Sequence, residues 1–317
     1  MYFKTTRAAV TVAGGAAALC LGSIPAALAA PASSAVLVPC SPVALHAALA
    51  DPGPGETLDL APGCTYSLPG SLPEITTDLT IVGYQSTLTR APHAGGFSLL
   101  TVGGLGCKGG IGGGGVNIPA GNANLNPDDL CKADLTVINV NFTDGGGYDV
   151  GTGGAIDNDG GTLHVTGGTF SDNESNNEAG AIYNDGHMTV NNGTFTDNLA
   201  HYGGAIYNDG VASIGGSSFT WNNAPTSDIA MRYNSYGGAI YNQADLHLAN
   251  SGFVGNSTGG YGGAIYTKDT LDAAHITVTA NAAAFGGGIY KFAGTATVFG
   301  SVVFGNQPDN CVHVTGC

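Results

Sequence analysis

The chain has very little positive charge. Its 317 residues include eight Lys and Arg against 23 Asp and Glu, so the formal net charge at pH 7 is −15. Binding to nucleic acid or to an anionic lipid surface relies on clustered Lys and Arg. The composition therefore argues against nucleic acid as a partner, and it disfavours polyuronates unless a divalent cation bridges the like charges.

Long apolar runs are missing after the first 29 residues. Residues 1–29 start with Lys4 and Arg7, continue through an alanine-rich apolar stretch and end in the letters ALA, the pattern of a secretion signal. Cys20 leaves a lipoprotein anchor as an alternative, but Leu19 before it is too large for that processing. No later segment has the roughly 20 apolar residues of a membrane span. We expect a secreted, extracellular protein without membrane insertion, either released or held at the cell surface by non-covalent contacts.

Cysteine is sparse but even in number once the signal is removed. An even count in an exported chain indicates disulfides. Sequence alone allows fifteen pairings of six cysteines, but the grouping along the chain favours three local ones, and no CxxC motif supports metal binding instead. The predicted pairs are Cys40–Cys64, Cys107–Cys131 and Cys311–Cys317.

Two motifs recur through the second half of the chain. The letters GGAIYN at 203–208 return with small changes at 153, 179, 237, 262 and 286. A second motif, Phe-x-x-Asn, ends at Asn173, Asn198, Asn222 and Asn256, and continues with Val in place of Phe to Asn281 and Asn306; these asparagines are 25, 24, 34, 25 and 25 residues apart. A fixed period in this range indicates a solenoid.

Each repeat reads as short strands joined by tight corners. Apolar and polar residues alternate with period two in segments such as TLHVTGGTF at 162–170, which is the strand period. A coil of about 25 residues with two or three short strands matches one turn of a right-handed parallel β-helix. The columns expected to face inward hold the Ile of each glycine motif (156, 182, 206, 240, 265, 289) and the Phe of each Phe-x-x-Asn motif.

We therefore predict an all-β chain, a single-stranded right-handed parallel β-helix with a short N-terminal capping helix over PVALHAALA, 42–50. Its expected parts are the signal at 1–29, a linker at 30–36, a cap with irregular first coils at 37–133, regular repeats at 134–306 and a disulfide cap at 307–317. Residues 107–131 hold too much Gly, Asn and Pro for a strand, so we expect a disulfide-closed excursion there.

Repeated GGA[ILV] with FxxN resembles the repeats of chlamydial polymorphic outer membrane proteins. It also resembles many secreted bacterial proteins with the pectate-lyase-like right-handed β-helix, or pectin lyase fold. The motifs cover residues 134–306, and the resemblance implies the fold and not an activity. The chain departs from the chlamydial pattern after the last repeat, where the sequence continues only with the short segment NQPDNCVHVTGC at 306–317.

The catalytic motifs of pectate-lyase-like enzymes are absent apart from Asp128-Asp129, which lies in the excursion. One carboxylate column is the best remaining candidate for chemistry. Asp159, Asp185 and Asp209 each stand two residues after the Asp or Tyr that follows the motif Ile. Stacked about 5 Å apart on consecutive coils, they could bind calcium or act as an acid and base pair. The alternative is that Asn-Asp-Gly only forms a turn. No other cofactor is expected.

The tyrosine of the glycine motif predicts a binding surface. Because it follows the inward Ile by one residue, strand alternation turns it outward. We expect an exposed aromatic ladder that stacks on sugars or on a cell-surface protein, with Arg232 from the loop at 223–236 beside it. The competing interpretation is that the ladder only stabilises the sheet. The ladder consists of Tyr183, Tyr207, Tyr241, Tyr266 and Tyr290.

These patterns favour a secreted, monomeric scaffold for extracellular binding or adhesion, with carbohydrate or a cell-surface protein as partner. A polysaccharide lyase or glycoside hydrolase of the pectate-lyase-like fold is the first alternative. A structural envelope protein is the second.

Overall fold

The computed structural model describes residues 35–103, 133–226 and 235–317. The predicted signal, the excursion with Cys107 and Cys131, and Arg232 lie outside the described residues. No helix within those three ranges is long and apolar enough to cross a membrane.

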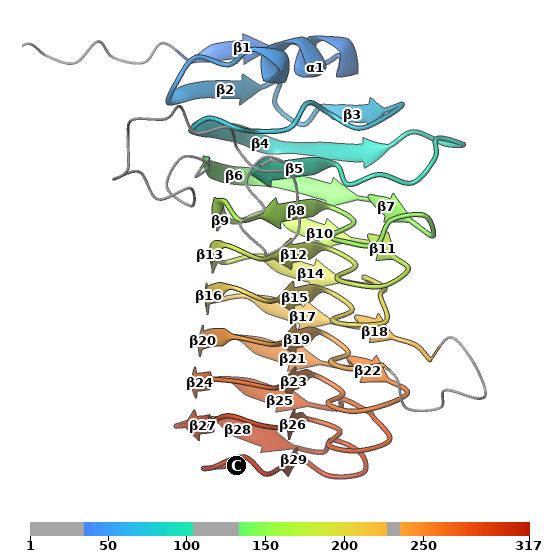
Figure 1. The fold of residues 1–317 in the computed structure, drawn as a ribbon, viewed down its shortest axis with the longest axis vertical. Helices are drawn as coiled ribbons and strands as arrows, with labels where there is room; N and C mark the ends of the chain where they lie inside the picture. Colours follow the sequence, from blue (N-terminus) through green and yellow to red (C-terminus); the bar gives the residue numbers. More distant parts are fainter. Residues whose placement is uncertain (1–34, 104–132, 227–234) are drawn as a thin grey trace, which may run out of the picture. The chain divides into compact units, whose positions relative to one another are not determined.

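The described chain is a parallel β-solenoid with one short helix (Figure 1). The helix, α1, spans Pro42–Ala50 and begins where the Ser41 hydroxyl accepts a hydrogen bond from the backbone N–H of Ala44 at 3.4 Å. A hydroxyl at this position satisfies one of the free N–H groups of the first turn, and proline is tolerated there. Leu45 and Leu49 of α1 are buried against the first strands, so the predicted capping helix is confirmed.

The largest sheet has 17 strands and consists of two runs that share the long strands β4 and β6. All of its pairings are parallel and in register, apart from one irregularity between Val82 and Ser86. The first run is β1 (Val36–Val38), β2 (Glu56–Leu60), β4 (Leu79–Arg90), β6 (Asp134–Thr143), β9 (Thr162–Thr166), β13 (His187–Asn191), β16 (Val211–Gly215), β20 (Asp245–Ala249), β24 (Leu271–Ala274) and β27 (Ala296–Phe299). The second run is β3 (Thr65–Leu68), β4, β6, β10 (Thr169–Ser171), β14 (Thr194–Thr196), β17 (Ser218–Thr220), β21 (Gly252–Val254), β25 (Thr277–Thr279) and β28 (Val302–Phe304).

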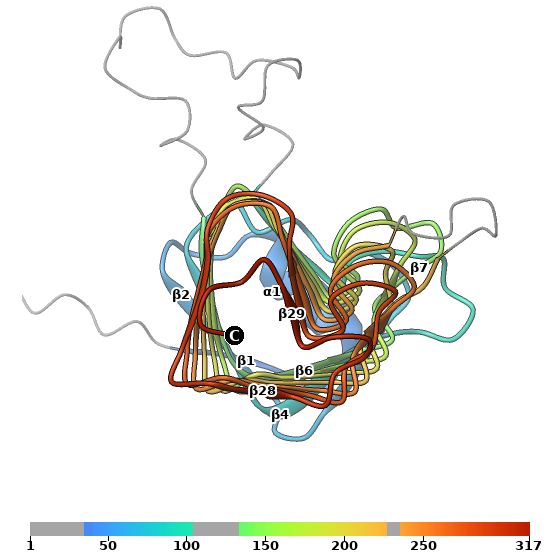
Figure 2. The same cartoon turned by 90° about the horizontal axis from the view of Figure 1, so that it is seen from below.

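A second sheet of eight strands closes the coils. It runs through β5 (Leu100–Gly103), β8 (Ile156–Asp159), β12 (Ile182–Asn184), β15 (Ile206–Asn208), β19 (Ile240–Asn242), β23 (Ile265–Thr267), β26 (Ile289–Lys291) and β29 (Cys311–Val312). Two short pairs, β7 (Gly146–Gly147) with β11 (Glu174–Ser175) and β18 (Asn223–Ala224) with β22 (Ser257–Thr258), form a lateral ridge. Figure 2 looks along the stack and shows the ridge loops projecting beside the coils at β7.

The core consists of the columns predicted from the period. The six motif isoleucines are 0% exposed and pair in register along the eight-stranded sheet. Behind the second run, Phe142, Phe170, Phe195, Phe219 and Phe253 form a stack of rings whose centroids are 4.9, 4.7, 4.7 and 4.7 Å apart. This separation matches the spacing of hydrogen-bonded strands.

The two glycines of each repeat are required for different structural reasons. Gly203 has a φ of 64°, a left-handed conformation that glycine adopts without steric cost. A Cβ on Gly204 would collide with the carbonyl oxygen of Gly238 on the next coil. The repeat therefore needs one glycine for the corner and the other for close packing between coils.

The asparagines of Phe-x-x-Asn form a buried ladder along one corner. Each side-chain N–H donates to the side-chain oxygen of the next asparagine, at 2.9 Å from Asn173 to Asn198 and 2.8 Å from Asn198 to Asn222. The same amide group also donates to the phenylalanine carbonyl of the preceding coil, as from Asn198 to Phe170 at 2.9 Å. The ladder satisfies backbone groups that the corner would otherwise leave unpaired.

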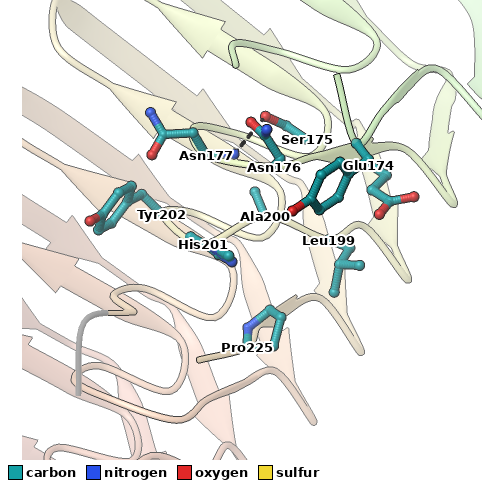
Figure 3. Close-up of a pocket in the computed structure, with 10 residues that line it drawn as sticks. Glu174, Ser175, Asn176, Asn177, Leu199, Ala200, His201, Tyr202 and Pro225 are labelled. Atoms are coloured by element: carbon teal, nitrogen blue, oxygen red, sulfur yellow. Dashed lines mark hydrogen bonds between the residues drawn. The ribbon is translucent and has the colours of Figure 1, made fainter. Parts of the chain in front are cut away.

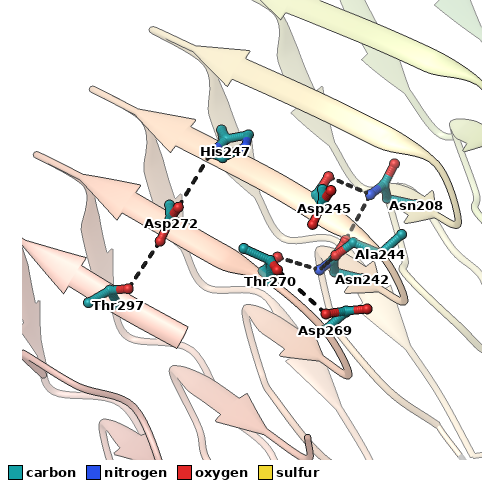
Figure 4. A network of polar contacts seen from close by, with 9 residues as sticks. All are labelled: Asn208, Asn242, Ala244, Asp245, His247, Asp269, Thr270, Asp272 and Thr297. Atoms are coloured by element: carbon teal, nitrogen blue, oxygen red, sulfur yellow. Dashed lines mark hydrogen bonds and ion pairs between the residues drawn. The ribbon is translucent and has the colours of Figure 1, made fainter. Parts of the chain in front are cut away.

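A second buried asparagine ladder, which the sequence did not predict, lies in the eight-stranded sheet. It links Asn158, Asn184, Asn208 and Asn242 at 2.6, 2.7 and 2.8 Å. Figure 4 shows Asn208 and Asn242 reaching the main-chain carbonyls of the adjoining corner, at 3.1 Å for Asp245 and 2.9 Å for Thr270.

Two of the three predicted disulfides are present. Cys40, which precedes α1, is bonded to Cys64 before β3, and Cys311 in β29 is bonded to Cys317; the Cα atoms are 5.6 and 6.2 Å apart. The predicted pair of Cys107 and Cys131 stays a prediction. The bonded pairs fasten the first and last described coils of the solenoid.

Candidate functional site

The tyrosines of the glycine motif stack on consecutive coils but are not an exposed ladder. Their register pairs Tyr183, Tyr207, Tyr241, Tyr266 and Tyr290 in sequence, with Asp157 in the coil before, as predicted. Tyr207, Tyr241 and Tyr266 are only 6%, 4% and 2% exposed. The prediction of an exposed aromatic ladder is therefore wrong, although the tyrosine side chains do point away from the main core.

A second row of aromatic side chains covers this inner row of tyrosines. The outer row consists of Tyr202, Tyr236, Tyr261 and Phe285, which pair coil to coil. Its ring centroids are 5.7, 5.6 and 4.9 Å apart. Tyr236 lies over both Tyr241 and Tyr266, at 5.9 and 4.7 Å, and the rings are tilted by 54° and 52°. Tilted contacts of this kind are favourable because the edge of one ring meets the face of the other.

The sequence contained the signal for the outer row. An aromatic residue stands immediately before the paired glycines in the motifs HYGGAIYN, SYGGAIYN, GYGGAIYT and AFGGGIYK. The left-handed glycine that follows folds the chain back. The aromatic residue before it then contacts the motif tyrosine of the next coil, as Tyr202 contacts Tyr241 and Tyr261 contacts Tyr290, and Tyr236 also contacts Tyr241 of its own coil. Strand alternation alone predicts the outward direction of the inner row but not what covers it.

Burial changes the acid–base behaviour of the inner row. Loss of solvent raises the pKa of Tyr183, Tyr207, Tyr241 and Tyr266 well above the usual range for a phenol. At the end of the row nearest Asp157, the negative charges of Asp185 and Glu178 raise the pKa of Tyr183 further. These four phenols therefore stay protonated throughout the physiological range.

Polar groups pack along one edge of the inner row. The Gln243 amide donates to the hydroxyl of Tyr207, and the hydroxyl of Tyr241 donates to the Gln243 oxygen at 3.3 Å. Lys268 donates to the same oxygen at 3.1 Å, with its ammonium 5.2 Å from the centre of the Tyr241 ring. Lys268 therefore combines a hydrogen bond with a cation–π contact.

The predicted aspartate column lies on consecutive coils. The backbone N–H groups of Asp185 and Asp209 donate to the carbonyls of Asn158 and Asn184, at 2.9 and 2.8 Å, which fixes the stacking. Asp159 is 8% exposed, whereas Asp185 and Asp209 are exposed. Among the described residues, no group of three or more His, Cys, Asp or Glu side chains is placed to hold a metal ion. The calcium and acid–base roles of the column, and the alternative that Asn-Asp-Gly only forms a turn, stay untested.

A cleft opens beside the outer row, on the lateral ridge. Its volume is about 590 Å³, and consecutive coils line it: Tyr148 follows β7, Glu174 and Ser175 form β11, and Pro225 follows β18. The outer-row residue Tyr202 lies at one end (Figure 3). Its other lining residues are Asn176, Asn177, Leu199, Ala200 and His201. No sequence pattern predicted this cleft.

Backbone pairing between coils makes the cleft wall rigid. Ser175 donates from its backbone N–H to the carbonyl of Leu199 at 2.9 Å, and its hydroxyl donates to the carbonyl of Val150 at 3.0 Å. The backbone N–H of Asn177 bonds the Ser175 hydroxyl at 3.2 Å, as drawn in Figure 3. The side chains of Asn176 and Asn177 are both exposed. The wall therefore holds its backbone fixed and leaves two amide side chains for a ligand.

The cleft combines aromatic rings with neutral and charged polar groups. Tyr148 is 79% exposed, so its ring is open to a ligand. Burial lowers the pKa of His201, which favours the neutral imidazole at pH 7. Glu174 is the acidic side chain of the lining. Ring faces together with amide and carboxylate groups can bind a molecule that has both apolar faces and hydroxyl groups.

No family model, curated protein or solved structure matches the chain. The structure shows the parallel β-solenoid, and the resemblance of the repeats to those of the chlamydial proteins stays a prediction from the motifs.

Proposed function

We propose that the protein is an extracellular scaffold that binds a neutral carbohydrate in the lateral cleft. The observation that carries this proposal is the side-chain set of the cleft. The open ring of Tyr148 and the ring of Tyr202 offer faces for a sugar ring, and Asn176, Asn177 and Glu174 offer hydrogen bonds for its hydroxyl groups. Binding sites for small ligands generally combine apolar contact with a few convergent polar groups.

Secretion is part of the proposal. Disulfides persist in oxidising compartments and are rare in the cytosol. The bonds Cys40–Cys64 and Cys311–Cys317, together with the signal pattern of residues 1–29, support an exported protein. An extracellular polysaccharide or the glycan of a cell-surface protein is a partner that such a protein meets.

The negative charge of the chain favours neutral carbohydrates over anionic ones as ligands. With a net charge of −15 and Glu174 in the cleft, the protein repels an anionic sugar chain. We therefore expect neutral glycans as ligands, and polyuronates only where calcium bridges the charges.

A glycan array tests the proposal, with calcium present and absent, and with Tyr148→Ala beside the wild type. Loss of the stacking ring should weaken binding of the array ligand about tenfold, which corresponds to roughly 1.4 kcal/mol. Phe292→Ala is the matched control, because Phe292 is 66% exposed and lies outside the cleft. Equal binding by Tyr148→Ala and the wild type would show that the ligand sits elsewhere.

Glu174 and His201 favour a second candidate, because a carboxylate and a neutral imidazole in one cleft are the usual groups of acid–base catalysis. The alternative function is that of a polysaccharide lyase or glycoside hydrolase. Assays for reducing sugars and for unsaturated uronates on the array ligands distinguish it from binding. If no glycan binds at all, the structural envelope role remains.

A further inference from the structure

The outward face of the second run carries two columns of hydroxyl side chains. On the six consecutive strands β3, β4, β6, β10, β14 and β17, the two outward positions are Thr or Ser at every place except one, which is Asn141. We call these twelve positions the hydroxyl face. Its first column is Thr65, Thr87, Asn141, Thr169, Thr194 and Ser218; its second is Ser67, Thr89, Thr143, Ser171, Thr196 and Thr220.

The spacing of the hydroxyl face is fixed by the core behind it. Each phenylalanine of the core stack stands between two outward residues, as in Thr194, Phe195 and Thr196. Ring centroids 4.7 Å apart from Phe170 to Phe195 and from Phe195 to Phe219 show the repeat along the solenoid. Along each strand the two columns are two residues apart, about 6.6 to 6.8 Å. The face is therefore a two-dimensional array with constant repeats.

The twelve positions of the face are uncharged and open to solvent, and aspartates border its second column. The hydroxyls of Thr89 and Thr143 donate to Asp144 at 3.5 and 3.4 Å, and the Thr196 hydroxyl donates to Asp197 at 3.0 Å. None of the twelve residues of the face is charged, and none is buried. By contrast, the outward side of the first run carries His164 beside Asp134, and His247 beside Asp272, at 3.6 and 3.7 Å (Figure 4 shows the second pair). The tyrosines of the eight-stranded sheet are covered by the outer row. The uncharged array is therefore a property of one face and not of the whole solenoid.

Several contacts make the array rigid. Threonine is stiff at χ1 because it branches at Cβ. The Ser171 hydroxyl donates to the Thr143 hydroxyl at 3.3 Å, and the Asn141 oxygen accepts from the backbone N–H of Thr169 at 3.0 Å. The asparagine ladder through Asn173 and Asn198 holds the adjoining corner. Hydroxyl and methyl groups on such a face keep their mutual spacing, unlike those on a flexible surface.

We propose that the hydroxyl face binds ice. Water next to the array meets donors, acceptors and methyl groups at two fixed repeats, and the repeat of 4.7 Å from strand to strand lies close to an oxygen repeat on a prism face of hexagonal ice. Water held in that pattern can join the crystal lattice. A crystalline polysaccharide fits less well, because the twelve positions include no aromatic ring for stacking on sugars.

The test is the thermal hysteresis of the purified mature protein, together with its partition into a slowly growing ice hemisphere. The wild type is expected to shape ice crystals and to enrich in the ice. The double variant Thr194→Tyr with Thr196→Tyr places bulky rings in the middle of the array and should lose most of the hysteresis. Thr189→Tyr is the matched control, because Thr189 points outward from the first run on the same coil. It should keep the wild-type value, and melting curves check that each variant is folded.

A gain of activity gives a second test. The next strand, β21, interrupts the array with Gly252 and Val254, after which Thr277 and Thr279 continue the two columns. A Cβ at Gly252 meets nothing within 4 Å, so Gly252→Thr is sterically allowed there. Together with Val254→Thr it extends the array from six strands to eight and should increase the hysteresis. A wild type that neither shapes nor enters ice would overturn the proposal. So would a folded Tyr double variant with unchanged hysteresis, or a folded extended array with no increase.

Discussion

The ring of Tyr236 lies across the ring of Tyr266, with 4.7 Å between centroids and a tilt of 52°. One ring comes from the corner before the glycine pair and the other from the strand after it, on neighbouring coils. Contacts of this kind bury the motif tyrosines, which form a second, aromatic core on the side of the solenoid and not an exposed ladder. This burial is the reason that we propose ligand binding in the lateral cleft and not at the tyrosine ladder.

Removing one aromatic ring of the outer row should destabilise the fold without changing the main core. Tyr236→Ala exposes Tyr241 and Tyr266, and because Tyr236 is itself half-buried we expect a loss of about 2 kcal/mol in the free energy of unfolding. Tyr236→Phe keeps the ring and should unfold like the wild type in urea. Equal stability of the alanine variant would mean that the outer row does not support the inner one.

The buried phenols predict alkaline unfolding. Burial raises the pKa of Tyr207 and Tyr241 in the folded state, whereas an unfolded tyrosine titrates near about 10. The unfolded state therefore releases protons first, so the stabilisation is complete below that pH and is lost as the pH rises above it. An optical titration should show the inner-row phenols ionising only together with unfolding. Ionisation of all tyrosines in a still-folded protein would contradict the burial.

Asn222 should be among the most sensitive polar positions. Its side chain donates to Phe195 and Asn256 and accepts from the backbone and the side chain of Asn198, at 2.8 to 3.2 Å. Asn222→Ala leaves these buried groups unsatisfied, at about 1–3 kcal/mol for each group left unpaired, so we expect several kcal/mol of destabilisation. Asn191→Ala, at an exposed strand position, is the control and should change the urea midpoint little.

The aspartate column can be tested with a chelator. Because Asp185 and Asp209 are exposed residues beside a buried asparagine ladder, we expect a turn role and an unchanged melting temperature in EDTA. A fall in melting temperature that Asp185→Asn abolishes would instead establish calcium binding at the column.

Peptide mapping under non-reducing conditions completes the disulfide pattern. We expect three local pairs and no free thiol in the mature chain, with Cys107 joined to Cys131 beside the two bonds already described. A peptide joining Cys107 or Cys131 to any of the other four cysteines would contradict this pattern.

Much of the fold could be predicted from the sequence because a solenoid repeats one local solution. The period of the asparagines fixed the length of the coil, and the alternation around Phe195 and Ile206 identified the inward columns. The capping helix at 42–50 could be predicted from apolar spacing in a short segment between cysteines. Each of these features depends on contacts within one coil or with the next coil in register.

The candidate site was less predictable, since it depends on contacts between corners. The outward direction of Tyr241 follows from strand alternation, but its burial depends on where the backbone of Gly237 carries Tyr236. The cleft brings Tyr148, Glu174 and Tyr202 together from three different coils through the path of the ridge loops. The path of a ridge loop depends on residues with a left-handed backbone and on isolated backbone bridges between coils. These features produce only a weak periodic pattern in the sequence.

The most direct test of the proposed function is a crystal structure of the protein with a neutral oligosaccharide selected on the array. A sugar ring against Tyr148, with its hydroxyl groups bonded to Asn176 or Asn177, is the result that we predict. A sugar bound to another face, with the cleft filled only by water, would contradict the assignment.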